Sequence, residues 1–158
     1  MDEGELRAKI LLTKSNIHDA LGETDASTAA LLEAAPLIDS EREPRMALIV
    51  RFNLVVDLCD QENAEEAQPR LAEVRRSAER IGEELDLTRC VWLEGKTAAG
   101  LGQKERARHL FEQVRRAFQA ARRESATVEL TRSVLRFLQR AQYDPELRFD
   151  GSQKAGAS

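Results

Sequence analysis

Apolar residues between positions 89 and 118 follow the spacing of two amphipathic helices joined by a short turn. Small residues gather at the end of the first helix, at Ala98, Ala99 and Gly100. Apolar residues of the second helix recur at intervals of three and four, at Ala107, Phe111, Val114 and Phe118. Gly102 is suited to the turn between them. The pattern predicts a helical hairpin in which small residues of one helix let the other pack closely.

The same pattern recurs when the sequence is shifted by forty residues. The aligned sets are Ser27, Ala67 and Ala107; Leu31, Leu71 and Phe111; Ala34, Val74 and Val114; Ile38, Ala78 and Phe118; and, at the turn, Gly22, Glu62 and Gly102. A hairpin repeated at a fixed period buries its apolar face by stacking on its neighbours. We therefore predict an all-α chain of three stacked hairpins, spanning approximately residues 5–40, 43–82 and 83–123.

Helix boundaries follow from capping residues, prolines and glycines. The expected helices span approximately residues 5–21, 25–39, 44–60, 63–81, 83–100, 103–123 and 125–142. Asp25 is the expected N-cap of the second helix, and Pro36 should kink or end that helix. Pro44 suits a first helical position, and Pro69 should bend the fourth helix, for which Gly82 is the expected stop.

The last predicted helix, residues 125–142, is apolar on one side and basic on the other. Its apolar side carries Val128, Val134, Leu135 and Leu138. A terminal helix with one apolar face is typical of the cap that closes a helical stack. Residues 1–142 are therefore expected to form one repeat domain. Residues 143–158 are expected to be a partly disordered tail, since GSQKAGAS is small and polar.

Two segments, FNLVVDLCDQENAEEAQPRL and WLEGKTAAGLGQKERARHLF, resemble tetratricopeptide repeats. The stretch 8–118 and the ending ATVEL...RFLQRAQYDPELRFD resemble the C-terminal part of bacterial tetratricopeptide-repeat proteins without assigned roles. The resemblance implies a right-handed α-α superhelix. Two features depart from that family. His18, Leu58 and Ala98 replace the usual large aromatic residue, and the period is forty rather than the commoner thirty-four, so longer helices are expected.

In this family the first helices of the hairpins line a concave groove that binds a peptide or a helix of a partner protein. The matching positions here include Asn16, Asp19, Phe52, Val56, Arg89, Trp92 and Lys96. One Trp and one Phe flanked by two bases would suit a partner segment with an acidic end. An alternative interpretation is that Phe52 and Trp92 only pack between repeats. The resemblance thus implies a non-catalytic protein-interaction scaffold.

Charge is distributed unevenly along the chain, whose net charge is -4. Residues 103–142 carry ten Lys or Arg against four acids, whereas the first 102 residues carry twelve bases against 21 acids. The predicted basic face comprises Arg115, Arg116, Arg122, Arg123, Arg132, Arg136 and Arg140. Such a face could contact nucleic acid, favour head-to-tail association or simply be solvated. Nucleic-acid contact is the less favoured function, because Phe111, Phe118 and Phe137 are needed for packing.

No motif for catalysis or for a ligand stands out. The sequence has no Gly-rich phosphate loop, no C-x-x-C, no paired His at helical spacing and no nucleophile elbow. Cys59, Cys90, His18 and His109 fall on separate helices without the close pairs of a zinc site. We expect neither an enzyme nor a bound metal or cofactor.

Composition and the N-terminus complete these expectations. With 42% hydrophobic and 33% charged residues but only 4% aromatic ones, the chain resembles a soluble helical protein rather than a disordered one. The acidic N-terminus has no long apolar run, so neither a secretory signal nor a membrane partner is expected, and the cytoplasm is the expected location. If the chain ended a longer array, its first helix would expose Ile10, Leu11 and Ile17 and would favour self-association.

Overall fold

The computed structural model describes residues 2–124. For residues 123 and 124 it describes the backbone but not the side chains. Its helices are α1 (Glu3–Ala20), α2 (Thr24–Ala34), α3 (Pro44–Asp60), α4 (Ala64–Ala67), α5 (Leu71–Ile81), α6 (Glu84–Gly100) and α7 (Lys104–Glu124), with short 3-10 segments η1 (Ala35–Leu37) and η2 (Gln68–Arg70). No strand occurs within residues 2–124, and the all-α prediction is confirmed there. The predicted cap helix, residues 125–142, and the tail, residues 143–158, lie outside the described part.

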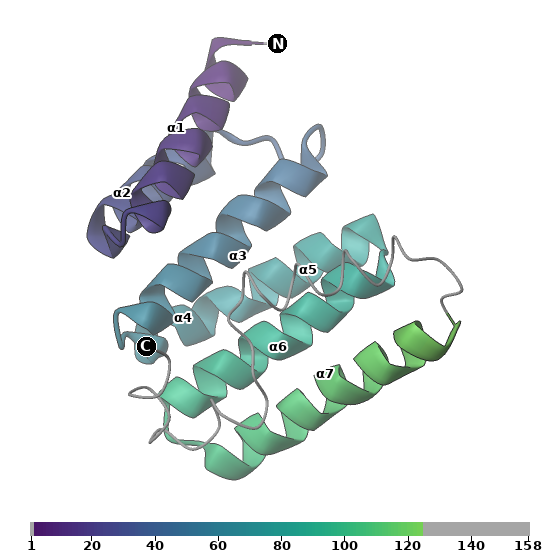
Figure 1. The fold of residues 1–158 in the computed structure, drawn as a ribbon. Helices are drawn as coiled ribbons and strands as arrows, with labels where there is room; N and C mark the ends of the chain where they lie inside the picture. Colours follow the sequence, from purple (N-terminus) through teal and green to yellow (C-terminus); the bar gives the residue numbers. More distant parts are fainter. Residues whose placement is uncertain (1, 125–158) are drawn as a thin grey trace.

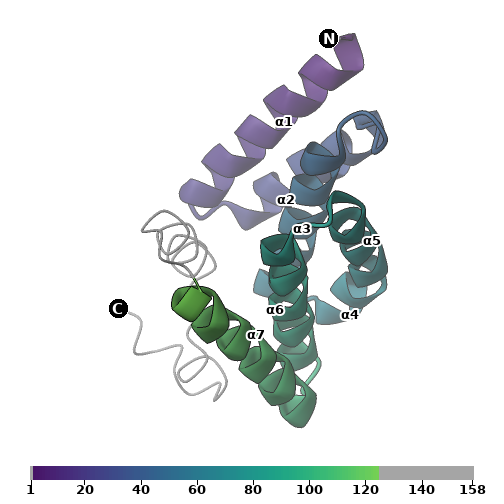
Figure 2. The same cartoon turned by 90° about the vertical axis from the view of Figure 1, so that its right-hand side faces the viewer.

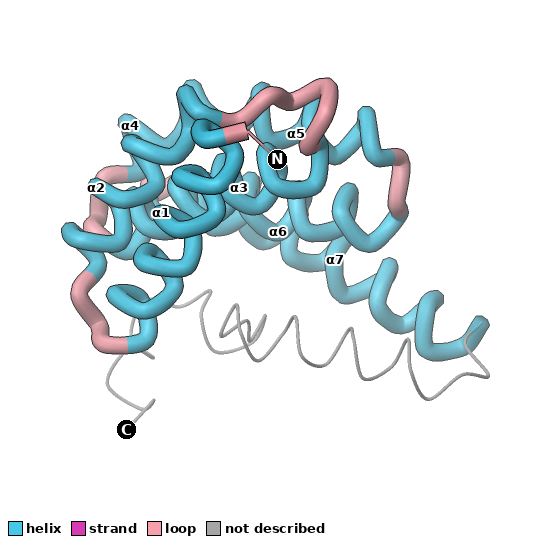
Figure 3. The backbone as a smooth tube through the Cα atoms, turned by 90° about the horizontal axis from the view of Figure 1, so that it is seen from above, coloured by secondary structure: helices cyan, strands magenta, loops and turns pink. Residues whose placement is uncertain are grey.

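The helices pair along the chain and each pair contacts the next one. α1 packs on α2, α3 packs on α4 and α5, and α6 packs on α7. α3 also contacts α2 on one side and both α5 and α6 on the other, so that it lies in the middle of the helical part (Figure 1). Short connections join successive helices (Figure 3). The sequence therefore produces three consecutive hairpins, and each one covers part of its neighbour.

Prolines and caps define most helix ends as expected. Pro44 is the first residue of α3, and Pro69 lies in the 3-10 segment η2 that interrupts the fourth predicted helix. Pro36 ends α2 at Ala34, five residues before the expected end, because proline lacks the N–H that would continue the helix. The predicted N-cap Asp25 was wrong: α2 begins at Thr24, and the side chain of the capping residue Glu23 makes no capping hydrogen bond.

The forty-residue period is visible in the backbone turn of each hairpin. Gly22, Glu62 and Gly102 adopt positive φ values of 75°, 60° and 74°. In each turn the next residue donates its N–H to the carbonyl five positions earlier, at N···O distances of 2.8, 2.8 and 2.9 Å. Each turn residue also donates to the carbonyl three positions earlier, at 3.0 to 3.1 Å. This is the Schellman arrangement, in which a left-handed residue satisfies the last free carbonyls of a helix.

We predict opposite effects of two substitutions in these turns. Glu62 adopts a left-handed conformation that disfavours residues with a Cβ, so Glu62→Gly should stabilise the fold by roughly 0.5–1 kcal/mol. Gly102→Ala forces a Cβ into the same conformation and should destabilise the fold by about 1 kcal/mol. Urea unfolding of both variants tests this prediction, and equal shifts in the same direction would contradict it.

Small residues of α6 allow close approach of helices both within the third hairpin and from the second one. A Cβ placed on Gly95 of α6 would lie 2.6 Å from Cε1 of Phe111 on α7, and one on Gly100 would lie 2.7 Å from the Cβ of Ala64 on α4. The aromatic ring therefore packs directly on the α6 backbone. The period-related Ala34, Val74 and Val114 are buried and form equivalent points of the core.

We predict that Gly95→Ala destabilises the protein by about 1–3 kcal/mol, because the Phe111 ring must shift. A loss of stability would identify the steric clash, since Gly→Ala within a helix otherwise stabilises the protein by roughly 0.5–1 kcal/mol. Gly4→Ala in α1, where the nearest atom lies 3.4 Å from the new Cβ, is the matched control and should not destabilise. Thermal or urea unfolding measures both, and the double variant G95A/F111L should recover part of the loss.

Candidate functional site

The predicted groove residues lie on the three first helices, α1, α3 and α6. Positions forty residues apart come together in space: the rings of Phe52 on α3 and Trp92 on α6 stack with centroids 6.0 Å apart and an interplanar angle of 23°. Val56 and Lys96 are a second pair of period-related positions, and Asn16 is their counterpart on α1. The structure thus brings predicted residues of the second and third hairpins together on neighbouring first helices.

Trp92 does not provide the accessible aromatic anchor that the sequence suggested. Its side chain is 3% exposed, and Phe52 is half-buried beside it. The alternative interpretation, that the two rings pack between repeats, describes the observed geometry. Helical spacing places Trp92 on a given side of its helix, but the neighbouring hairpin decides whether that side is covered.

The two bases expected beside these rings are engaged within the protein. Lys96 Nζ lies 2.6 Å from Oδ1 of Asp60 and 5.7 Å from the centre of the Trp92 ring. Arg89 Nη1 donates to Oδ1 of the buried Asp86 at 3.1 Å. Lys96 therefore joins α6 to α3, whereas Arg89 pairs within α6 with the carboxylate that Arg45 of α3 also binds.

The accessible part of the predicted groove is smaller and more polar than expected. Asn16 and Asp19 of α1 are exposed, and Val56 of α3 is half-buried. Ile49 of α3 lies one turn before the ring pair and is 38% exposed. These residues and the edge of Phe52 form what we call the first-helix face: Asn16, Asp19, Ile49, Phe52 and Val56.

Two arginines in the described part of the predicted basic face share one carboxylate of their own helix. Nε and Nη2 of Arg115 donate to the two carboxylate oxygens of Glu112 at 2.9 and 2.8 Å, and Arg116 Nε donates to the same carboxylate at 3.3 Å. Arg122 is exposed. The side chain of Arg123, and Arg132, Arg136 and Arg140, lie outside the described part.

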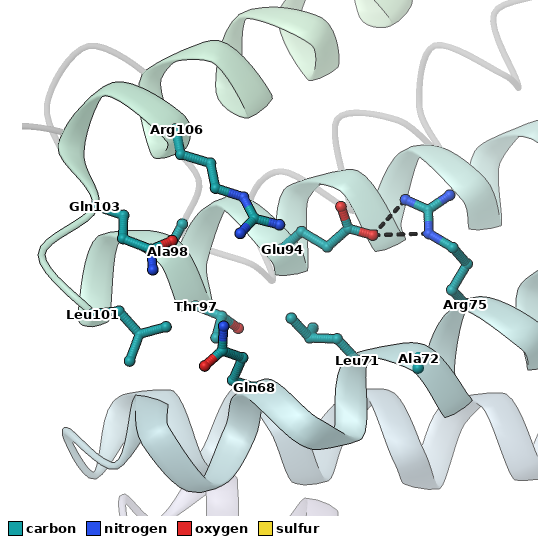
Figure 4. A pocket seen from close by; sticks show the side chains of 10 residues that line it. All are labelled: Gln68, Leu71, Ala72, Arg75, Glu94, Thr97, Ala98, Leu101, Gln103 and Arg106. Atoms are coloured by element: carbon teal, nitrogen blue, oxygen red, sulfur yellow. Dashed lines mark hydrogen bonds and ion pairs between the residues drawn. The ribbon is translucent and has the colours of Figure 1, made fainter.

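A cleft opens on the other side of α6 from Trp92 and Lys96, as the 100° advance per residue requires. It has a volume of about 280 Å³ and is lined from α6 by Glu94, Thr97, Ala98 and Leu101, with Gln68, Leu71, Ala72, Arg75, Gln103 and Arg106 from the neighbouring segments. The guanidinium of Arg75 forms an ion pair with Glu94, while that of Arg106 points toward the cleft (Figure 4). The sequence analysis did not find this cleft, because its residues come from η2, α5, α6 and α7.

A buried carboxylate joins the first two hairpins through hydroxyl groups. Asp57 of α3 is 4% exposed, and its Oδ2 accepts hydrogen bonds from Ser27 at 2.7 Å and from Thr28 at 3.3 Å. Ser15 of α1 contacts Ser27 at 2.9 Å between their Oγ atoms, and Gln61 donates to Thr28 at 2.6 Å. Burial raises the pKa of Asp57 to about 6; the hydroxyls oppose this rise, and two nearby acids, Asp19 and Asp60, add to it.

A second buried carboxylate joins the second and third hairpins through arginines. Asp86, in the first turn of α6, is 1% exposed, and Nη1 of Arg45 from the first turn of α3 donates to its Oδ2 at 2.6 Å. Arg45 also pairs with Glu83 at 2.9 Å. The sequence pattern indicated neither of these two buried carboxylates. Burial of an acid requires polar partners, but the pattern alone does not show which polar residues will meet.

Neither thiol has the properties of an activated nucleophile. Burial raises the pKa of Cys90 to about 11 and also raises that of Cys59, so both remain protonated at neutral pH. In residues 2–124 no three His, Cys, Asp or Glu side chains converge in a geometry that could bind a metal ion. Among the described helices none combines the length and apolarity needed to cross a membrane.

Comparisons of the chain with protein-family models, with curated proteins and with solved structures found no match. The tetratricopeptide-repeat relationship therefore stays a prediction.

We predict that Asp57→Asn stabilises the protein at pH 7.5 and that this advantage disappears in acid. A carboxyl whose folded-state pKa is raised destabilises the fold when ionised; the penalty is present above pH 6 and fades as the pH falls toward the unfolded value near 3.8. Two pKa units correspond to roughly 3 kcal/mol, an upper value because the amide changes the hydrogen bonding.

Urea unfolding of D57N and the wild type at pH 7.5, 6.0 and 4.5 measures this difference. The exposed acid Asp25 of α2 provides the matched control, D25N. A difference between D57N and the wild type that stays constant across this range would contradict the prediction.

Proposed function

We propose that this protein is a non-catalytic protein-interaction scaffold of the tetratricopeptide-repeat type. In this proposal the three hairpins form a short right-handed superhelix, and its concave side binds a peptide or helix of a partner protein. The observation that carries the proposal is the stacking of Phe52 on Trp92 at 6.0 Å, because it aligns period-related positions of consecutive first helices. Side-by-side first helices with a common face are the surface that repeat proteins use for binding.

The chemistry of the described residues supports binding rather than turnover. The buried acids Asp57 and Asp86 are held by hydroxyls and arginines in the joints between hairpins, and both thiols have raised pKa values. These groups support the architecture instead of converging on a cavity. The nucleic-acid alternative has less support, since Arg115 and Arg116 are occupied by Glu112.

The partner segment would contact the first-helix face rather than Trp92. Ile49 supplies an accessible aliphatic side chain on α3, and Asn16 and Asp19 supply polar contacts on α1. Such a face is suited to an amphipathic helix or an extended peptide with a small apolar anchor. Because Lys96 and Arg89 are engaged internally, an acidic partner end is no longer required.

We predict that N16E/I49E weakens binding of the partner while leaving the fold intact. Both positions are exposed, so two carboxylates can be added without a core change. Loss of the apolar contact at Ile49, together with two new charges, should weaken binding at least about tenfold. A photo-crosslinking residue at Asn16 or Ile49 would first identify the partner, and calorimetry with the purified partner would then compare the variants.

The matched control is A29E/A120E, which adds the same two charges at exposed positions of the second helices α2 and α7. It should bind within about twofold of the wild type. Binding that survives N16E/I49E would reject the first-helix face. If binding were instead lost with Arg106→Ala, the partner site would be assigned to the cleft beside α6.

A further inference from the structure

One side of α1 carries a row of exposed aliphatic side chains. Leu6, Ile10, Ile17 and Leu21 are 50%, 58%, 56% and 67% exposed. At 100° per residue they fall within about 60° of one another around the helix. The opposite side of α1 packs on α2 through Ala8, Leu11 and Ser15, which are buried. We call these four residues the α1 stripe; the expected exposure of Ile10 and Ile17 is confirmed, and that of Leu11 was wrong.

The forty-residue period shows what kind of surface the α1 stripe is. The counterparts of Leu6, Ile10 and Ile17 are Met46, Val50 and Asp57 on α3, and Asp86, Cys90 and Thr97 on α6. All six are between 0 and 7% exposed. They are covered by the preceding hairpin: Asp57 bonds to Ser27 of α2, and Cys90 Sγ lies 3.9 Å from the carbonyl of Val74 on α5. In the first hairpin the same three positions carry aliphatic residues that are at least half exposed. Their helix, α1, lies at the outer edge of the helical part (Figure 2).

The spacing of the four residues in the α1 stripe reads the same from either end of the helix. Successive members are separated by four, seven and four residues, so a twofold axis passing between Thr13 and Lys14 relates Leu6 to Leu21 and Ile10 to Ile17. An antiparallel copy of α1 would therefore place Leu against Leu and Ile against Ile along the whole row. Closed twofold dimers are the commonest assemblies of a single chain, and they need such a self-complementary patch. At the axis, the aliphatic stem of Lys14 can cover the seam while its ammonium reaches solvent.

The area of the stripe sets the strength of the contact. Four half-exposed aliphatic side chains offer roughly 400 Å² of apolar surface, within the range of patches that mark interaction sites on monomers. A standard stable interface buries about 800 Å² on each partner. The stripe and its flanking side chains thus fit a reversible dimer that forms as concentration rises, rather than a permanent one.

We propose that the α1 stripe is a dimer interface at which α1 pairs antiparallel with α1 of a second copy of this chain. Ile10 then meets Ile17 of the partner subunit near the axis, with the two leucine contacts outside. Asn16 and Asp19 lie on another side of α1, so each copy keeps its first-helix face for a different protein. The inference does not depend on the proposed scaffold function.

Sedimentation velocity of the full chain over a wide concentration range tests this pairing. The wild type should shift reversibly from monomer to dimer. I10E/I17E should remain monomeric and show an unchanged circular dichroism spectrum and melting temperature, because both residues are exposed. The charge-matched control A29E/A120E should associate like the wild type.

The variant I10K/I17E tests the orientation of the two helices. In the antiparallel pair each new ammonium faces a new carboxylate, so at low salt this variant should associate at least about tenfold more strongly than I10E/I17E. In a parallel pair like charges would meet at both positions. A wild type that stays monomeric at several hundred micromolar, equal association of I10E/I17E and the wild type, or no difference between the two charge variants would each overturn the proposal.

Discussion

The left-handed turn between the two helices of each hairpin is the constraint on which the rest of the described structure depends. At Gly22, Glu62 and Gly102 the backbone reverses with a similar positive φ and the same pair of hydrogen bonds, so each second helix starts in the same register relative to the first. Because the register is fixed, residues forty apart occupy equivalent places in the core. The stack of Phe52 on Trp92 and the burial of Ala34, Val74 and Val114 both follow from that equivalence.

Local features made the helices predictable, whereas contacts between hairpins were not predictable from the same information. Pro44, Gly82 and Gly102 act through their own backbone geometry, and the helix ends they mark were located to within a residue. Asp25 is not the N-cap because the carbonyl of Glu23, two residues earlier, already accepts a hydrogen bond from the N–H of Ser27 at the start of the helix. Trp92 failed as an accessible anchor because the residue that covers it, Phe52, is forty positions away.

The buried acids show a different limit, since they depart from the period that organises everything else. Asp57 has the counterpart Thr97 in the third hairpin, and Asp86 has Met46 in the second. Their partners are equally specific: the counterparts of Ser27 and Thr28 are Ala67 and Gln68. If α3 docked against a copy of α4 and η2, the carboxylate of Asp57 would lose its serine donor and would be buried at a higher cost.

The ion pair between Arg45 and Asp86 is equally specific, and it favours one order of the hairpins. The counterpart of Arg45 on α1 is Glu5, so a third hairpin docked on the first one would place a second carboxylate beside Asp86. Such repulsion, together with the loss of the arginine, disfavours wrong pairings between hairpins of similar shape.

The α1 stripe has no such restriction. At the position of Asp57 it carries Ile17, and at that of Asp86 it carries Leu6, so it can be covered by any complementary apolar surface without a matching polar group. Partner choice at that surface then rests on shape alone, and the four-seven-four spacing gives a second copy of α1 that complementary shape.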